Sequence, residues 1–152
     1  MRFLMIDPFA KHIREHLTPK ALDRDFFRAE IGCQWVQRIK LTDQIEMWID
    51  EECLLDASGR QQFFTFFGFG SILGGRAIVC GASRLGDSIS VPASFPISIL
   101  ERHVQWLGGE AELEMLIEAG EASRPTNYVT ENGERQKAWE WRAQGRALET
   151  VH

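Results

Sequence analysis

The sequence predicts a small α+β domain, in which a mainly antiparallel sheet is covered by two or three helices and followed by a polar C-terminal tail. The chain has 152 residues, a natural length for one domain with its own core. Several short segments alternate apolar and polar residues, as strands do, and others repeat apolar residues at helical spacing. From Gly120 the residues become mostly polar. We therefore expect one domain over residues 1–119 and a tail over residues 120–152 that is either docked or mobile.

The chain begins with a predicted buried strand over residues 3–6. Asp7 and Pro8 end this strand, because proline lacks an N–H donor and restricts the residue before it. Residues 10–17 fit either a helix face or an alternating strand, and the pattern leaves both readings open.

A helix is predicted over residues 19–31. Thr18 can cap its first turn, Pro19 suits the first helical position, and Gly32 suits the end. Its apolar residues recur at helical spacing and comprise Leu22, Phe26, Phe27 and Ile31.

Residues 35–40 and 45–50 alternate in the manner of strands, and a short polar connection joins them. This pattern predicts an antiparallel hairpin. The apolar set Ile45, Met47 and Ile49 should face the core. Trp48 lies on the opposite face between two acids, so we expect its ring to be half exposed.

The rest of the domain is predicted to alternate between strands and helices. A segment with five phenylalanines in seven residues, 63–69, is expected to belong to the core. The other predicted elements are a short strand and turn at 53–59, a buried strand at 76–80, a short strand at 89–91, and helices at 96–107 and 111–119.

Charge and cysteine content narrow the class of partner and the compartment. The net charge of −5 disfavours direct nucleic-acid binding, which depends on lysine and arginine, and suits a basic partner. Cys33, Cys53 and Cys80 are widely spaced and predict free thiols in a reducing compartment. The first apolar run is too short for a signal peptide, and none is long enough to span a membrane. The sequence thus predicts a cytoplasmic protein with no membrane contact.

Four short motifs follow one another in a recognisable order. They are the strand and turn at 3–8, Glu30-Ile31-Gly32-Cys33, Trp48-Ile49-Asp50-Glu51-Glu52, and the glycine-flanked strand at 75–81. Over residues 1–107 this order resembles the DUF3846 family, an uncharacterised family of bacteriophages and bacterial mobile elements. The chain departs from the family pattern at Cys33 and Cys53, where glycines are common. Because that family has no established activity, the resemblance implies an origin and a host bacterial cell, not a reaction.

These observations favour a non-enzymatic binding protein that acts on a host protein, with a defence system as one such target. Acid-lined aromatic residues suit a basic partner surface, because the acids steer and the rings anchor. The predicted contact residues are Trp48, Asp50, Glu51 and Glu52 on the hairpin, and Trp139 and Trp141 on the tail. A homo-oligomer is compatible with the phenylalanine-rich segment.

The alternative is a protein that binds or sequesters a nucleotide-like small molecule. Arg76 and Arg84 would meet its anionic group beside the glycine turns, and an aromatic ring would stack on the base. The glycines precede a strand and lack a nearby lysine, so they do not form a phosphate loop.

Catalytic and metal sites are weakly indicated. Asp50 and Glu52 share a strand face and could act as acid and base in a hydrolase, but exposed turn residues are the expected reading. His12 and His16 could share one helix face, yet no further metal ligand lies nearby. The sequence therefore predicts no enzyme, cofactor or metal site.

Overall fold

A computed structural model describes residues 1–54, 59–66 and 72–122 of the chain. Over these residues it contains nine strands in two antiparallel sheets and three helices, which confirms the α+β class. The predictions for Leu55 to Ser58, for Phe67 and Phe69, and for the tail beyond residue 122 lie outside the described residues.

The larger sheet has the strand order β2-β1-β7-β4-β3, and β8 pairs with the end of β7. All of its pairs are antiparallel. Its strands are β1 (Arg2–Asp7), β2 (His12–Leu17), β3 (Val36–Lys40), β4 (Ile45–Asp50), β7 (Ala77–Ala82) and β8 (Ser88–Ile89). The predicted hairpin is thus confirmed as β3–β4. The ambiguous segment 10–17 contains strand β2 from His12 onward, preceded by a turn.

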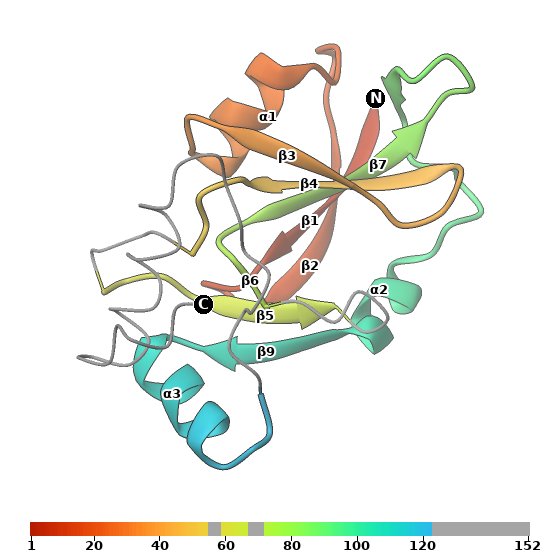
Figure 1. Cartoon of the computed structure of the whole chain (residues 1–152). Helices are drawn as coiled ribbons and strands as arrows, with labels where there is room; N and C mark the ends of the chain where they lie inside the picture. Colours follow the sequence, from red (N-terminus) through yellow and green to blue (C-terminus); the bar gives the residue numbers. More distant parts are fainter. Residues whose placement is uncertain (55–58, 67–71, 123–152) are drawn as a thin grey trace.

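The smaller sheet has the order β6-β5-β9 and packs against the larger one (Figure 1). Its strands are β5 (Phe63–Phe66), β6 (Ile72–Gly74) and β9 (Val104–Gly108). Phe63, Phe64 and Phe66 are buried, so this part of the phenylalanine-rich segment belongs to the core, as predicted.

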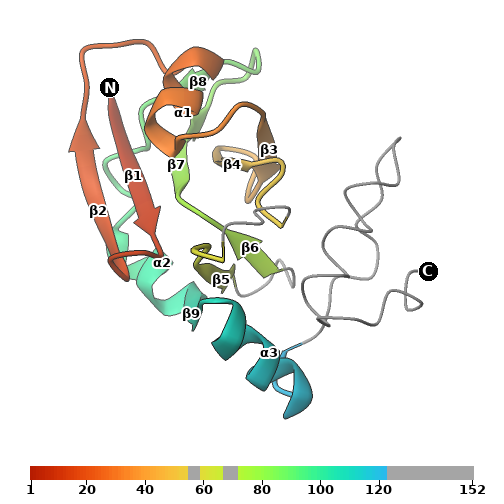
Figure 2. The same cartoon turned by 90° about the vertical axis from the view of Figure 1, so that its left-hand side faces the viewer.

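Helices cover the outer faces of the two sheets, as Figure 2 shows from the side. Helix α1 (Arg24–Ile31) packs on the larger sheet, and α3 (Glu110–Glu118) packs on the smaller one. Helix α2 (Ile97–His103) closes one side of the core between the sheets through Leu100. None of the helices in the described ranges is long and apolar enough to cross a membrane.

The first helix begins at Arg24, five residues later than predicted. Asp23, not Thr18, caps it, because the Asp23 carboxylate accepts the Phe26 N–H at 2.8 Å. Thr18 instead donates its N–H to the carbonyl of Met1 and ends the β1–β2 ladder. The predicted end at Gly32 is confirmed, with a left-handed φ of 81°.

The helix predicted over residues 96–107 was wrong in its last four residues. Helix α2 ends at His103, and the following residues form β9. Their pairing with β5 places Trp106 opposite Phe64 and Val104 opposite Phe66, and β-branched and aromatic residues pack well on such a surface. Strand pairing across the chain thus overrides the local helical period.

Gly81 should not tolerate a side chain, because β8 approaches it closely. A Cβ atom there would lie 2.4 Å from the Ser90 carbonyl oxygen, so strand backbone would have to move. We expect Gly81→Ala to lower the free energy of unfolding in urea by about 1–3 kcal/mol. Leu85→Ala is the control in the same hairpin, since its side chain is 90% exposed and its loss leaves the strand contacts in place. Equal stabilities of Gly81→Ala and wild type would show that the strands are not packed this tightly.

Candidate functional site

Trp48 does not lie at the surface, which corrects the prediction of a half-exposed ring. Its side chain is 5% exposed and stacks on Phe27 of α1, with ring centroids 4.6 Å apart. The guanidinium of Arg24 lies 5.2 Å from the centroid of the same ring. The reason is that β4 is buried on both faces: one faces the smaller sheet, and the other faces α1. The Trp48 ring therefore serves the core and is not available to a partner in this structure.

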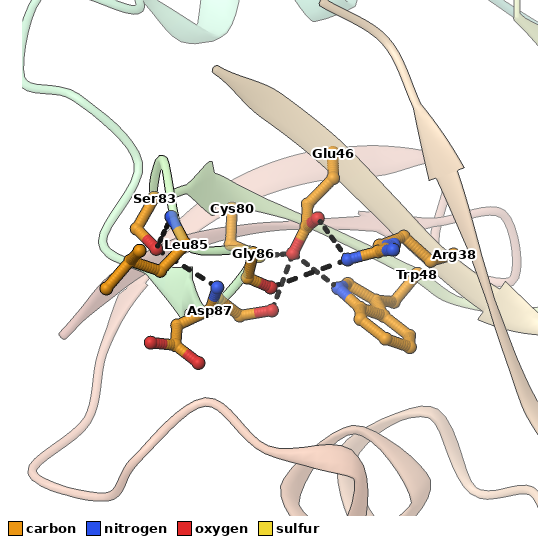
Figure 3. A network of polar contacts seen from close by, with 9 residues as sticks. Arg38, Glu46, Trp48, Cys80, Ser83, Leu85, Gly86 and Asp87 are labelled. Atoms are coloured by element: carbon orange, nitrogen blue, oxygen red, sulfur yellow. Dashed lines mark hydrogen bonds and ion pairs between the residues drawn. The ribbon is translucent and has the colours of Figure 1, made fainter. Parts of the chain in front are cut away.

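Glu46 is the centre of a buried polar network beside Trp48 (Figure 3). Its side chain is only 2% exposed. One carboxylate oxygen, Oε1, accepts hydrogen bonds from Trp48 Nε1 at 3.0 Å and from the Ser88 hydroxyl at 2.5 Å. The Cys80 thiol donates a weaker bond to the same oxygen at 3.7 Å. These donors come from three strands, so the carboxylate ties β4 to β7 and β8.

The same network holds the turn between β7 and β8. Arg38 lies 3.7 Å from the other Glu46 oxygen and donates to the Gly86 carbonyl at 3.5 Å. Within the turn, the Ser83 hydroxyl accepts the N–H groups of Leu85 and Asp87 (Figure 3). The turn is therefore well ordered by hydrogen bonds while Leu85, at its tip, is 90% exposed.

Removing the Glu46 carboxylate should destabilise the fold strongly. Glu46→Ala would leave the buried Trp48 N–H without an acceptor, at a cost of about 1–3 kcal/mol, and would also remove the partner of the partly buried Ser88 hydroxyl. We expect a smaller loss for Ser88→Ala, which removes one donor, and almost none for the control Glu101→Ala, an exposed position on α2. Urea unfolding measures all three. A Glu46→Ala variant as stable as Glu101→Ala would contradict the network.

Among the described residues the exposed tryptophan is Trp35, which lies near the C-terminal end of β4 and has half of its side chain accessible. It immediately precedes β3, and its carbonyl accepts the Glu51 N–H at 2.8 Å and the Cys33 thiol at 3.5 Å. The turn after β4 is further held by Asp50, whose carboxylate accepts the Glu52 N–H at 2.8 Å. The structure thus brings Asp50, Glu51 and Glu52 together beside Trp35, not beside an exposed Trp48.

Sequence reasoning missed both Trp35 as a surface residue and Glu46 as a buried one. The signal for Trp35 lay in the hairpin register: Val36 pairs with Asp50, so the residue before Val36 lies opposite the acidic turn. The apolar stripe of α1 could have indicated the burial of Glu46. That stripe has to pack on a sheet face, and the face it covers is the second face of β4, on which Glu46 and Trp48 lie.

Arg76 and Arg84, the predicted ligand-binding pair, lie near opposite ends of β7. Arg76 forms an ion pair with Asp7 at 3.4 Å, and its guanidinium lies 5.5 Å from the Phe9 ring centroid. Arg84 belongs to the turn that carries Leu85. The structure does not bring the two arginines together.

The histidines do not form a metal site with the other side chains that the structure describes. His12 and His16 lie in strand β2 instead of a helix, and His16 stacks on Phe3. Within the described ranges, no group of three His, Cys, Asp or Glu residues could hold a metal ion. Trp139 and Trp141 lie outside the described residues.

Searches with this chain find no matching protein-family model, curated protein or solved structure. The resemblance to the DUF3846 family therefore stays a prediction from the sequence.

The buried thiols should make the fold sensitive to alkaline pH. Burial raises the pKa of Cys53 from 9.0 to about 12, and burial together with the Glu46 charge does the same for Cys80. The folded protein keeps these protons while the unfolded chain releases them above pH 9.0. Stability is therefore full below that pH and falls as the pH rises toward the folded pKa, by about 1.4 kcal/mol per pH unit and thiol.

Urea unfolding between about pH 8 and pH 10.5 tests this linkage. Cys80→Ala should lose stability less steeply with pH than the wild type. Parallel slopes for the two proteins would show that the Cys80 thiol does not retain its proton in the folded state.

Proposed function

We propose that this chain is a non-enzymatic binding protein of bacteriophage or mobile-element origin that acts on a host protein in the bacterial cytoplasm. The observation that carries the binding role is the half-exposed Trp35 beside the Asp50–Glu52 turn. The resemblance to the DUF3846 family supports the origin, and a defence complex is one class of host target.

Trp35 has the properties of an interface anchor. A tryptophan offers a large apolar surface at a low cost in conformational entropy, and such residues dominate the binding energy of many interfaces. Here the backbone of Trp35 is held by the Glu51 N–H and the Cys33 thiol. Because the anchor is already positioned, less ordering is needed when a partner binds.

The acidic turn indicates the chemistry of the partner. Asp50, Glu51 and Glu52 are consecutive, and all three are partly exposed. Acidic groups at the rim of an apolar anchor accelerate encounter with a basic surface and disfavour acidic ones. We therefore expect a partner that presents lysine or arginine around an apolar pocket, such as a nucleic-acid-binding surface of a host protein.

Capture from a host lysate with the immobilised full chain tests this function. The wild type should retain one stoichiometric partner, and Trp35→Ala should weaken its binding by about 30-fold, which corresponds to a loss of about 2 kcal/mol. Glu52→Lys should slow association and reduce its salt dependence. Leu85→Ala is the matched control, because it removes an equally prominent apolar side chain at the opposite end of β4.

Two outcomes would refute the proposal. One is that no stoichiometric partner is retained by the wild type. The other is that Trp35→Ala and Leu85→Ala bind the partner equally well, which would place the interface elsewhere. Unfolding curves of each variant establish that the comparison is made between folded proteins.

A further inference from the structure

The acidity of this chain is concentrated in one segment. Residues 104–122 contain five glutamates and no lysine, arginine or histidine, so they alone account for the net charge of −5. These residues form β9, α3 and the turn that follows. The glutamates are Glu110, Glu112, Glu114, Glu118 and Glu121.

Helix α3 has a buried face and an open face. Leu113 packs with Phe63 and Leu107 of the smaller sheet. On the other side Met115 is 67% exposed, and Glu112 and Glu118 are its helical neighbours at three residues' distance. Figure 2 shows α3 on the outside of the fold. An exposed apolar side chain is thus flanked by acids on this face.

The C-terminal end of α3 adds to this negative potential. The last turn contains no basic residue, and Glu118 lies where the helix dipole is itself negative. Glu121 follows directly, and its N–H donates to the Leu116 carbonyl. A basic segment would therefore be attracted to this end of the helix more strongly than to a helix that carries its own lysine or arginine.

The chain itself contains a segment of the opposite character. Residues 135–146 hold four basic side chains against the single acid Glu140. They also contain Trp139 and Trp141, so the segment combines positive charge with two large apolar rings. Its basic residues are Arg135, Lys137, Arg142 and Arg146.

The connection is long enough for the two to meet. Residue 122 packs beside α3, and twelve residues separate it from residue 135. Twelve residues of random-coil chain would span about 20 Å on average, whereas a nine-residue helix is about 14 Å long. A tethered segment also acts at an effective concentration on the order of millimolar, so modest contacts suffice.

We propose that residues 135–146 dock on the open face of α3 in the same molecule. Trp139 and Trp141 cover Met115, and the basic side chains face Glu118 and Glu121. This inference does not rest on the proposed host-protein function, because it involves neither Trp35 nor the Asp50–Glu52 turn. It assigns Trp139 and Trp141, which the sequence predicts as partner contacts, to a surface of the same chain.

Hydrogen exchange of the full chain, followed by mass spectrometry, tests the docking. In the wild type, amides of 135–146 should exchange more slowly than an unstructured peptide. The double variant Glu118→Lys, Glu121→Lys should speed their exchange by about tenfold, equivalent to about 1.4 kcal/mol of docking. Adding Arg142→Glu and Arg146→Glu should restore the slow exchange. Glu101→Lys on α2 is the control and should change nothing.

Peptides from β4 report whether each variant is folded. If the α3 variants unfold, Trp139→Ala, Trp141→Ala provides the second test, because docking predicts faster exchange in α3 itself. Unprotected amides in wild-type 135–146, or protection that the α3 and tryptophan variants leave unchanged, would overturn the proposal. Protection that is lost on dilution would place the segment on a second copy and overturn docking within one molecule.

Discussion

Strand β4 is buried on both faces, and much of the larger sheet is arranged around the polar groups that this burial encloses. One face places Ile45, Met47 and Ile49 between the sheets. The other carries Glu46 and Trp48 beneath α1 and the turn that leads into β8. A buried carboxylate is costly unless donors replace the water it loses. The donors to Glu46 come from β4, β7 and β8, so satisfying one side chain fixes the position of three strands.

Hydrogen bonds at both ends of β4 connect this buried strand to residues at the surface. Arg38 connects the Glu46 carboxylate to the Gly86 carbonyl and so joins the network to an exposed turn. At the other end of β4, the Asp50 carboxylate accepts the Glu52 N–H, and the Glu51 N–H donates to the Trp35 carbonyl, which holds the acidic turn against Trp35. Both ends of the strand thus present ordered surface residues, although their side chains differ in chemistry.

Local patterns in the sequence predicted most strands and the end of α1, because alternation, glycine and proline act within a few residues. They could not predict β9. Residues 97–107 carry a helical period throughout, and only the distant strand β5 decides that residues after His103 become extended. The prediction for Trp48 failed for a related reason. Its acidic neighbours indicated exposure, whereas the deciding contact, with Phe27, comes from a helix about twenty residues earlier. The predicted exposure of Trp48 was therefore wrong, and the exposed ring beside the acidic turn is that of Trp35.

Steering by acidic charge and anchoring by apolar side chains are two separate roles on this surface. Cys53 and Leu54, which follow the acidic turn, share a buried cluster with Leu113 of α3. The turn and the helix are thus joined through the core, and each carries acidic residues that attract a basic segment without choosing where it binds. The choice falls to the apolar side chains, Trp35 beside the turn and Met115 on the helix. Since rings and thioethers act only at contact distance, two basic ligands can both be steered by acidic groups and still be held at different places.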